Sequence, residues 1–451
     1  MIKRLGSVLL AVFMLAMACA PAGAALKAGT AKRDITPELG CVLGGYYGAG
    51  RATGVHDPLH ARILVLDDGE RKVVMVSMDL IMINGFMSTE IKEQITKRYG
   101  IPPERVTISA THTHTGPEGY YEEFGKYPRE YIPEMKMKIE NEVLLGVGSA
   151  LNSMQRAQAG VLMEVMPGYN HSRHISTGPL DSNIFILLVK DMDGKPIGGL
   201  FNLASHPVIV PFQDLLISAD WPGVFAAEME KKVDGTFMFL QGPAGDITPA
   251  GTHGENGWEK IQDYGERVAQ EVIKRFDRIE TTTDFKVDGR METMILPVRT
   301  MKEALVYRKK MSELEKTVND AGYGDAERKK RIGWIREKAG LDSFLVPLMK
   351  SMKRVKKGRT RTWMQVLRLG DGVMIAFPGE AIGEIGLRLR DEFKPHPVGV
   401  LNCTNDHLAY ITTQRYYDEG GFESGMGMVY PESTEKMIQA AEEMTKALIK
   451  N

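Results

Sequence analysis

The sequence predicts a mixed α/β fold in which a large β-sheet core is flanked by helices. Short apolar runs rich in β-branched residues recur along the chain and have the length of buried strands. The clearest of these runs cover 71–81, 106–110, 197–201, 237–240 and 373–377. Segments with helical patterning, such as Trp258 to Phe276, separate some of them. This alternation favours helices packed around a sheet core.

Residues 1–24 have the pattern of a secretory signal peptide. Two basic residues precede an apolar stretch from Val8 to Met17, which is too short to span a membrane, and small residues follow. We therefore expect cleavage before Ala25 and export to the periplasm or the medium. Cys19 raises the alternative of a lipoprotein anchor, which Ala16 three positions earlier disfavours.

Residues 25–451 are expected to form one catalytic domain with a charged helical insertion at about 301–361. Apolar residues recur in this insertion at helical spacing: Tyr307, Met311, Leu314 and Val318. The insertion ends in a basic cluster made of Lys350, Lys353, Arg354, Lys356, Lys357, Arg359 and Arg361. A solvated helix face is the simpler interpretation of these charges, and contact with a membrane surface or an anionic cell-wall polymer is the alternative.

The charge and the cysteines exclude two classes of protein. The formal net charge of −1 argues against a nucleic-acid partner, which usually requires a basic excess. Cys41 and Cys403 are the cysteines that follow the expected cleavage site, so the chain is not a disulfide-rich scaffold. These two cysteines can pair in an oxidising compartment only if the fold brings them together.

A pair of histidines follows the strand expected at 106–110. His112 and His114 are two residues apart, and side chains along a strand alternate between its faces. Both imidazoles are therefore expected on the same side. Such a pair is typical of a metal or catalytic site, but hydrogen-bonded structural histidines show the same spacing.

Three further predicted strands also end in polar residues. His206 follows one of them, Asp246 and Thr248 lie in a Gly/Pro-rich loop after the next, and Glu380 follows the last. Glu380 is expected at the start of a helix over 381–393, where its simplest role is to complement the helix dipole. Together, these junctions place histidines and a carboxylate at one edge of the sheet. Two histidines and a carboxylate with an open position are the ligand set of a catalytic zinc ion.

Five segments carry a more specific signal. They are Thr111–Pro117, Ser205–Pro207, Gly245–Pro249, Phe377–Glu380 and Ala409–Thr413. In residues and in order they resemble the signature segments of the neutral/alkaline, non-lysosomal ceramidase family. The resemblance implies that His112, His206, Glu380 and Tyr410 hold one zinc ion per chain.

The resemblance also implies roles for the neighbouring residues. His114 is expected to contact substrate and to assist proton transfer or oxyanion stabilisation, in which Tyr410 is expected to share. Thr248 takes the position of the family's active-site serine, as a catalytic or hydrogen-bonding hydroxyl. Asp246 is expected to hold a ligand or its own loop in place.

The chain departs from the family pattern at several positions. Thr248 replaces a serine, and Phe422 stands where a substrate-contacting tyrosine is expected. Arg173 is the nearest counterpart of a substrate-contacting arginine. Residues 25–451 are also expected to lack the immunoglobulin-like C-terminal domain of typical members.

The expected function is that of a zinc-dependent hydrolase in sphingolipid metabolism. It would cleave the N-acyl linkage of ceramide or a related N-acyl lipid by attack of a zinc-activated water. One alternative is an exported zinc hydrolase that acts on an N-acyl sugar, a cell-wall amide or an ester. Another is a non-catalytic metal- or lipid-binding relative. An amidohydrolase barrel would show eight regular strand–helix units, which the sequence pattern lacks.

Overall fold

The computed structural model describes most of the chain. It covers residues 25–45, 50–118, 120, 132–174, 179–210, 212–251, 257–299, 355–419 and 422–450, with scattered residues between 309 and 328. The predicted signal peptide lies outside the described residues. The predicted helical insertion does too, apart from those scattered residues and 355–361.

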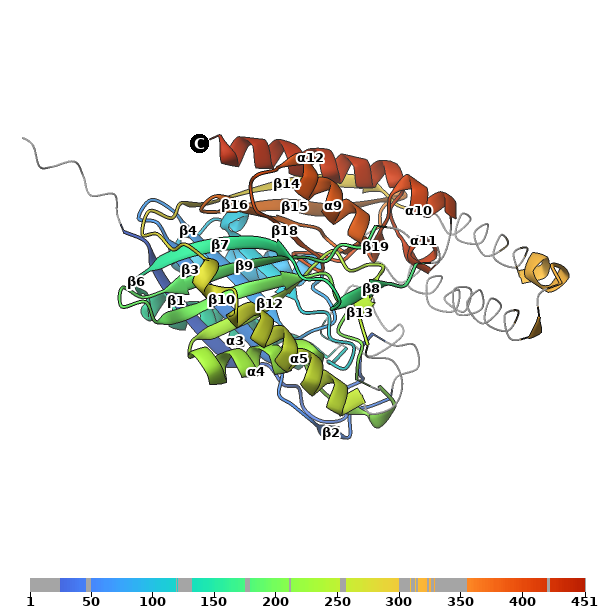
Figure 1. The fold of residues 1–451 in the computed structure, drawn as a ribbon, viewed down its shortest axis with the longest axis horizontal. Helices are drawn as coiled ribbons and strands as arrows, with labels where there is room; N and C mark the ends of the chain where they lie inside the picture. The colour runs from blue at the N-terminus through green and yellow to red at the C-terminus, as the bar shows by residue number, and fades with distance from the viewer. Residues whose placement is uncertain are drawn as a thin grey trace, which may run out of the picture.

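Three β-sheets form the centre of the protein (Figure 1). The first, in the order β5-β4-β3-β1-β6, consists of β1 (Lys27–Asp34), β3 (His60–Asp67), β4 (Lys72–Met78), β5 (Val106–Ala110) and β6 (Gln155–Arg156). The second, in the order β12-β10-β9-β7, consists of β7 (Gln158–Val165), β9 (Asn183–Lys190), β10 (Pro196–Leu203) and β12 (Thr236–Gln241). The third, in the order β14-β15-β16-β18, consists of β14 (Val287–Pro297), β15 (Arg359–Leu369), β16 (Gly372–Ala376) and β18 (Val398–Leu401).

The strands carry continuous apolar runs because both faces of each sheet are buried. In β3, Ile63 and Val65 face a core shared with the helices outside the first sheet. Leu64 and Leu66 face the opposite way, into a central core to which all three sheets contribute side chains. The sheets are thus held together by one shared apolar centre.

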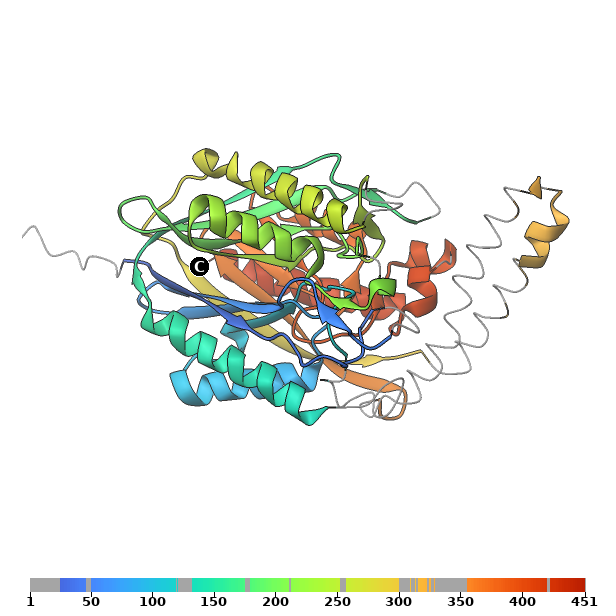
Figure 2. The same cartoon turned by 90° about the horizontal axis from the view of Figure 1, so that it is seen from below.

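Each sheet is covered on its outer face by helices. These are α2 (Gly85–Tyr99) and α3 (Pro133–Asn152) on the first sheet, α4 (Asp220–Val233) and α5 (Gly257–Ile273) on the second, and α9 (Gly383–Glu392) and α12 (Pro431–Ile449) on the third. Figure 2 shows the teal α3 on the opposite side of the molecule from the green α4 and the yellow-green α5. Asn84 fixes the start of α2 because its side chain accepts the N–H of Met87 at 2.8 Å. Among the described helices, none has the length and apolar character needed to span a membrane.

Each sheet contains one pair of parallel strands, and these pairs determine where polar loops gather. The pairs are β4–β5, β10–β12 and β16–β18. Short elements follow these strands along the chain: β11 (Leu216–Ile217) after β10, β13 (Ile247–Pro249) after β12, β17 (Glu380–Ala381) after β16, and β19 (Tyr410–Ile411), α10 (Gln414–Glu419) and α11 (Phe422–Met426) after β18. Two more short strands pair with them, β2 (Gly54–Val55) with β11 and β8 (Asn170–Ser172) with β13. Figure 1 places β8, β13, β19, α10 and α11 at the same end of the sheets. Binding sites of α/β proteins usually form at such an end.

The predicted fold class is confirmed, with two corrections of detail. The described strands form open sheets, which excludes the amidohydrolase barrel. Glu380 does not begin a helix. It lies in β17, since its N–H donates to the Ala409 carbonyl at 2.9 Å, and α9 begins only at Gly383. In addition, β15 begins at Arg359, so the last residues of the predicted insertion belong to a sheet.

Candidate metal centre

His112 and His114 meet at the site, but not for the reason that strand alternation suggests. β5 ends at Ala110, and His112 adopts a left-handed backbone conformation with φ of 74°. The His112 N–H donates to the Leu80 carbonyl at 2.9 Å, which turns the chain out of the sheet. The Nε2 atoms of His112 and His114 nevertheless lie 3.3 Å apart. The turn, rather than the pleat, brings the two imidazoles together.

Three imidazoles and one carboxylate converge in this region. Nitrogen atoms of His112, His114 and His206 all lie within 4.8 Å of one another. Glu380 Oε2 lies 3.3 Å from His112 Nε2 and 3.2 Å from His206 Nε2. Three of the four side chains are buried, and His114 is partly exposed. The structure thus joins residues that the sequence places on three separate strands.

The outer nitrogens of two imidazoles are held by backbone carbonyls. His112 Nδ1 is 2.6 Å from the Ile81 carbonyl, and His206 Nδ1 is 3.1 Å from the Ile247 carbonyl. Because a carbonyl only accepts, each Nδ1 must donate, which directs both Nε2 atoms toward the cluster. Asp246 is therefore not the acceptor for either imidazole. It accepts hydrogen bonds from the Gly383 N–H and the Tyr416 hydroxyl, so it holds its own loop in place.

The electrostatics of the cluster favour a cation. Burial lowers the pKa of His206 to about 4, and burial together with neighbouring charges lowers the pKa of His114 well below its usual value. Both imidazoles are therefore neutral near pH 7. Burial alone would raise the pKa of Glu380, but the neighbouring imidazoles hold it well below its usual range. Burial lowers the pKa of His112, but Cys403 and Glu380 raise it well above its usual value, so His112 must lose a proton before it can bind a cation. An ionised carboxylate and neutral imidazoles are donors that zinc prefers.

Tyr410 enters the site beside Glu380. The two residues are register partners in the parallel β17–β19 pair. Arg173 Nη2 donates to the Tyr410 hydroxyl at 3.0 Å and to the Gly245 carbonyl at 2.8 Å. Burial and the charge of Glu380 raise the pKa of Tyr410 well above its usual value, against the opposing effect of Arg173. Tyr410 is therefore a neutral phenol in this structure.

Arg173 and Phe422, both predicted from the sequence, lie next to Tyr410. The Arg173 guanidinium is 5.2 Å from the centre of the Phe422 ring, which meets the Tyr410 ring edge-on at 5.3 Å. Arg173 Nε donates to Glu423 Oε1 at 3.0 Å. These contacts fix the guanidinium at the border of the cluster of imidazoles and Glu380.

Thr248 is linked to the cluster through its own strand. In the β8–β13 pair it lies opposite His171, and its hydroxyl oxygen is 3.2 Å from His171 Nε2. The preceding residue, Ile247, supplies the carbonyl that orients His206. One short strand therefore carries both the hydroxyl and the acceptor for a candidate ligand.

Sequence reasoning missed two residues near Glu380 and Tyr410. His407 Nε2 is 3.6 Å from Glu380 Oε1, and Glu423 anchors Arg173. A histidine three positions before Tyr410 was the available signal for the first. Cys41 and Cys403 do not pair with each other, because both are buried free thiols. The Cys403 sulfur instead lies 3.4 Å from His112 Nδ1.

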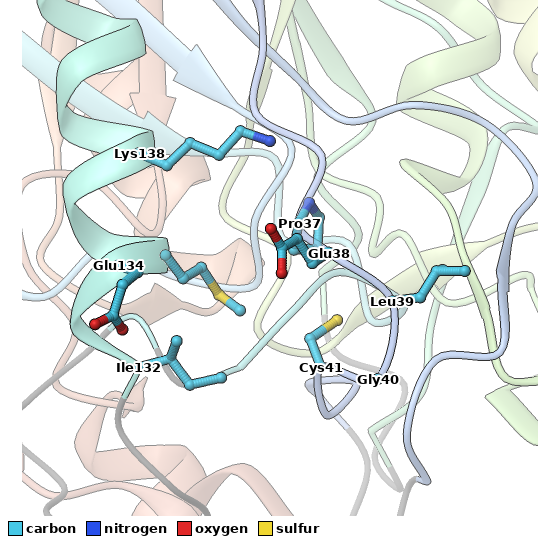
Figure 3. A pocket seen from close by; sticks show the side chains of 9 residues that line it. Pro37, Glu38, Leu39, Gly40, Cys41, Ile132, Glu134 and Lys138 are labelled. Atoms are coloured by element: carbon cyan, nitrogen blue, oxygen red, sulfur yellow. The ribbon is translucent and has the colours of Figure 1, made fainter.

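A separate cavity lies outside this cluster. Figure 3 shows it between the segment Pro37–Cys41 and the first turns of α3. Its volume is about 340 Å³. Its charged lining residues are Glu38, Glu134 and Lys138, and no histidine lines it. The candidate site therefore rests on the chemistry of its donors rather than on this cavity.

Comparison with known proteins assigns the chain to a family. The family model described as neutral/alkaline non-lysosomal ceramidase, N-terminal, matches residues 26–321. The chain belongs to this family. It is 28% identical over 200 residues to neutral ceramidase 1 of Arabidopsis thaliana, a match that covers 40% of this chain and 25% of that protein. The neutral ceramidase of Mycobacterium tuberculosis is 24% identical over 256 residues, which cover 50% of this chain and 40% of the relative.

Solved structures of the family share the fold. The crystal structure of neutral ceramidase from Pseudomonas aeruginosa superposes with a TM-score of 0.76 and 18% identity, covering 94% of this chain and 75% of that one. A ceramidase complexed with C2 gives a TM-score of 0.74, also with 18% identity. The sequence matches span less than half the length of the curated relatives above, so they do not transfer a whole protein's activity.

Proposed function

We propose that this chain is a zinc-dependent hydrolase that cleaves the N-acyl linkage of ceramide or a related N-acyl lipid. The observation that carries the proposal is the cluster of three imidazoles and Glu380, with its nitrogens within 4.8 Å of one another, in a chain of the ceramidase family. Two solved ceramidase structures share the fold of this chain. One of them is a ceramidase complexed with C2, which favours a lipid ligand.

The residues present fit a zinc ion. His112, His206, Glu380 and Tyr410 would hold it, because their oxygen and nitrogen donors are of the type that zinc takes in catalytic sites. A zinc ion supplies Lewis-acid polarisation of a carbonyl and lowers the pKa of water toward neutrality. His112 would hold the ion as a neutral imidazole, after it has released its Nε2 proton to solvent.

The chain's own residues then handle substrate and protons. His114 is partly exposed and neutral, so its imidazole can take a proton at nitrogen or donate one to a developing oxyanion. Arg173 holds the Tyr410 hydroxyl by a 3.0 Å hydrogen bond and keeps a positive charge at the border of the site. The Thr248 hydroxyl, paired with His171, is suited to orient water or the substrate amide.

We also propose two aspects of the chain's organisation, one for its catalytic part and one for its export. Residues 25–451 act as one catalytic domain with its inserted segment, and the signal-like residues 1–24 direct export to the periplasm or the medium. A mature N-terminus at Ala25, read by sequencing of the exported protein, tests the second aspect.

The test combines metal content with substrate turnover. Purified protein is analysed for metal by elemental analysis and assayed for fatty-acid release from ceramide, N-acyl sugars and simple esters. We expect about one zinc per chain and turnover of ceramide, with both lost in His206→Ala. His396→Ala is the matched control, because His396 lies outside the cluster and contacts the Asp371 carbonyl.

The outcomes separate metal from substrate. If the protein binds zinc and hydrolyses an N-acyl sugar or an ester but not ceramide, the assigned substrate would change and zinc-dependent hydrolysis would stand. Zinc without any turnover would favour a metal- or lipid-binding protein. Absence of zinc from the purified wild-type protein, even after incubation with zinc salts, would refute the proposed mechanism.

A further inference from the structure

Glu380 presents its two oxygens to different sides of the site. Oε2 faces His112 and His206, at 3.3 and 3.2 Å from their Nε2 atoms. Oε1 faces His407, whose Nε2 lies 3.6 Å away, just beyond hydrogen-bonding distance. The ring centres of His407 and His112 are 6.3 Å apart, so the fourth imidazole stands behind the carboxylate rather than among the three clustered nitrogens.

We propose that His407 is a positioning residue for the metal site, donating from Nε2–H to Glu380 Oε1 when Glu380 Oε2 binds the ion. This inference rests on the proposed function. In this role His407 neither binds the metal ion nor contacts the substrate. Ligating carboxylates in metal sites are generally held by an outer hydrogen bond of this kind.

The loop that carries His407 is fixed tightly enough to position an imidazole. The neighbouring Asp406 accepts the His407 N–H at 2.8 Å and the Thr362 hydroxyl at 2.6 Å. Asn405 accepts the Ile108 N–H at 3.0 Å and donates its own N–H to the Ile108 carbonyl at 2.7 Å. The loop is thereby attached both to β15 and to β5, the strand that leads to His112.

The backbone of this loop shows the strain expected of a position held by its surroundings. Cys403, Asn405 and Ala409 are non-glycine residues with φ of 48°, 63° and 56°, in the left-handed region. Such conformations persist only where packing and hydrogen bonds enforce them. The strain therefore lies on either side of His407.

Burial makes the proposed hydrogen bond effective. The side chains of His407 and Glu380 are 10% and 7% exposed. An ionised carboxylate oxygen in such surroundings is unfavourable without a donor, and a donor that reaches it is stronger than in water. His407 thus favours the single rotamer of Glu380 that points Oε2 at the imidazole cluster.

The experiment measures zinc affinity directly. Apoprotein of the wild type, His407→Phe and His407→Gln is titrated with zinc in competition with a chelating dye, and stoichiometry is counted by elemental analysis. We expect one zinc per chain in all three, with affinity about 10–100-fold lower in His407→Phe. His407→Gln should lose less, because its amide still offers a donor. His396→Phe, at the control position outside the cluster, should match the wild type.

Further readouts separate positioning from folding. The melting temperatures of the metal-free wild type and metal-free His407→Gln should be alike. When Co²⁺ is bound in place of zinc, its absorption bands should differ between His407→Phe and the wild type. Affinity of His407→Phe within twofold of the wild type would overturn this inference alone. If the wild type bound a second zinc ion per chain and His407→Phe did not, His407 would be a metal ligand. That result would also overturn the inference. A wild-type protein that binds no zinc would refute the proposed function as well.

Discussion

Replacement of Arg173 by methionine tests how the border of the metal site is held together. Arg173→Met keeps the aliphatic stem but removes the guanidinium, which bonds Glu423 at 3.0 Å, the Tyr410 hydroxyl at 3.0 Å and the Gly245 carbonyl at 2.8 Å. The side chain of Glu423 is only 1% exposed. Its charge would therefore lose its nearest cation without gaining water.

The expected loss of stability depends on how deeply Arg173 and Glu423 are buried. Removal of one member of a fully buried ion pair destabilises a protein by about 3–5 kcal/mol. Here the Arg173 side chain is 25% exposed, and His174 Nδ1 remains 3.6 Å from Glu423 as a second positive partner when protonated. We therefore expect a loss of about 2–3 kcal/mol in the free energy of unfolding, below the range for a fully buried pair.

Urea unfolding of the metal-free protein, followed by tryptophan fluorescence, measures this loss. The double variant Arg173→Met with Glu423→Gln is the control, since it removes the stranded charge and should recover more than half of the loss. A loss under about 0.5 kcal/mol would show that Arg173 does not hold Glu423 in place. A double variant no more stable than Arg173→Met would refute the electrostatic explanation.

Three further perturbations have defined outcomes. Thr248→Ala should keep one zinc per chain and lower fatty-acid release by no more than about tenfold, because the hydroxyl orients water or substrate rather than attacking it; loss above a thousandfold with zinc retained would indicate a nucleophile. Lys92→Met should raise stability near neutral pH. Burial lowers the pKa of Lys92 to about 7 from 10.5, so in the wild type the unfolded state alone binds this proton between about pH 7 and 10. Wild-type stability should rise across this window, by up to about 4 kcal/mol at 1.4 kcal/mol per pKa unit, and this increment should be absent from the pH profile of the variant. Chelation of zinc should lower the melting temperature of the wild type but not that of His206→Ala, and zinc at 100 times its Kd should restore about 2.7 kcal/mol; equal shifts in both proteins would place the metal elsewhere.

Five strands of the three main sheets, and three of the side chains that cluster beyond them, could be predicted from the sequence. The apolar run at 106–110 corresponds residue for residue to β5, and the run at 71–81 contains β4, because a strand buried on both faces leaves a continuous apolar signal. His112, His206 and Glu380 were recognisable because each follows such a run. Strand ends at one sheet edge gather by topology alone, which sequence patterns can anticipate.

The remainder depended on contacts that leave no local pattern. The left-handed turn at His112 has no glycine to mark it, and Glu380 pairs with β19 instead of starting a helix. His407 lies in a loop and Glu423 in the short helix α11, and the positions of both are set by distant partners. The contact of Arg173 with Glu423 spans 250 positions along the chain, and no spacing rule covers such a distance.

The clustered side chains are far apart along the sequence, and these separations also govern the order of folding. His206 and Glu380 are 174 positions apart, and His112 comes from the first sheet while Glu380 follows a strand of the third. Their donors can meet only after the sheets have docked, because closing such loops carries a large entropic cost. The binding energy of an ion is thus available to the native state and absent from the folding transition state. An ion bound here would therefore lower the unfolding rate and leave the refolding rate unchanged.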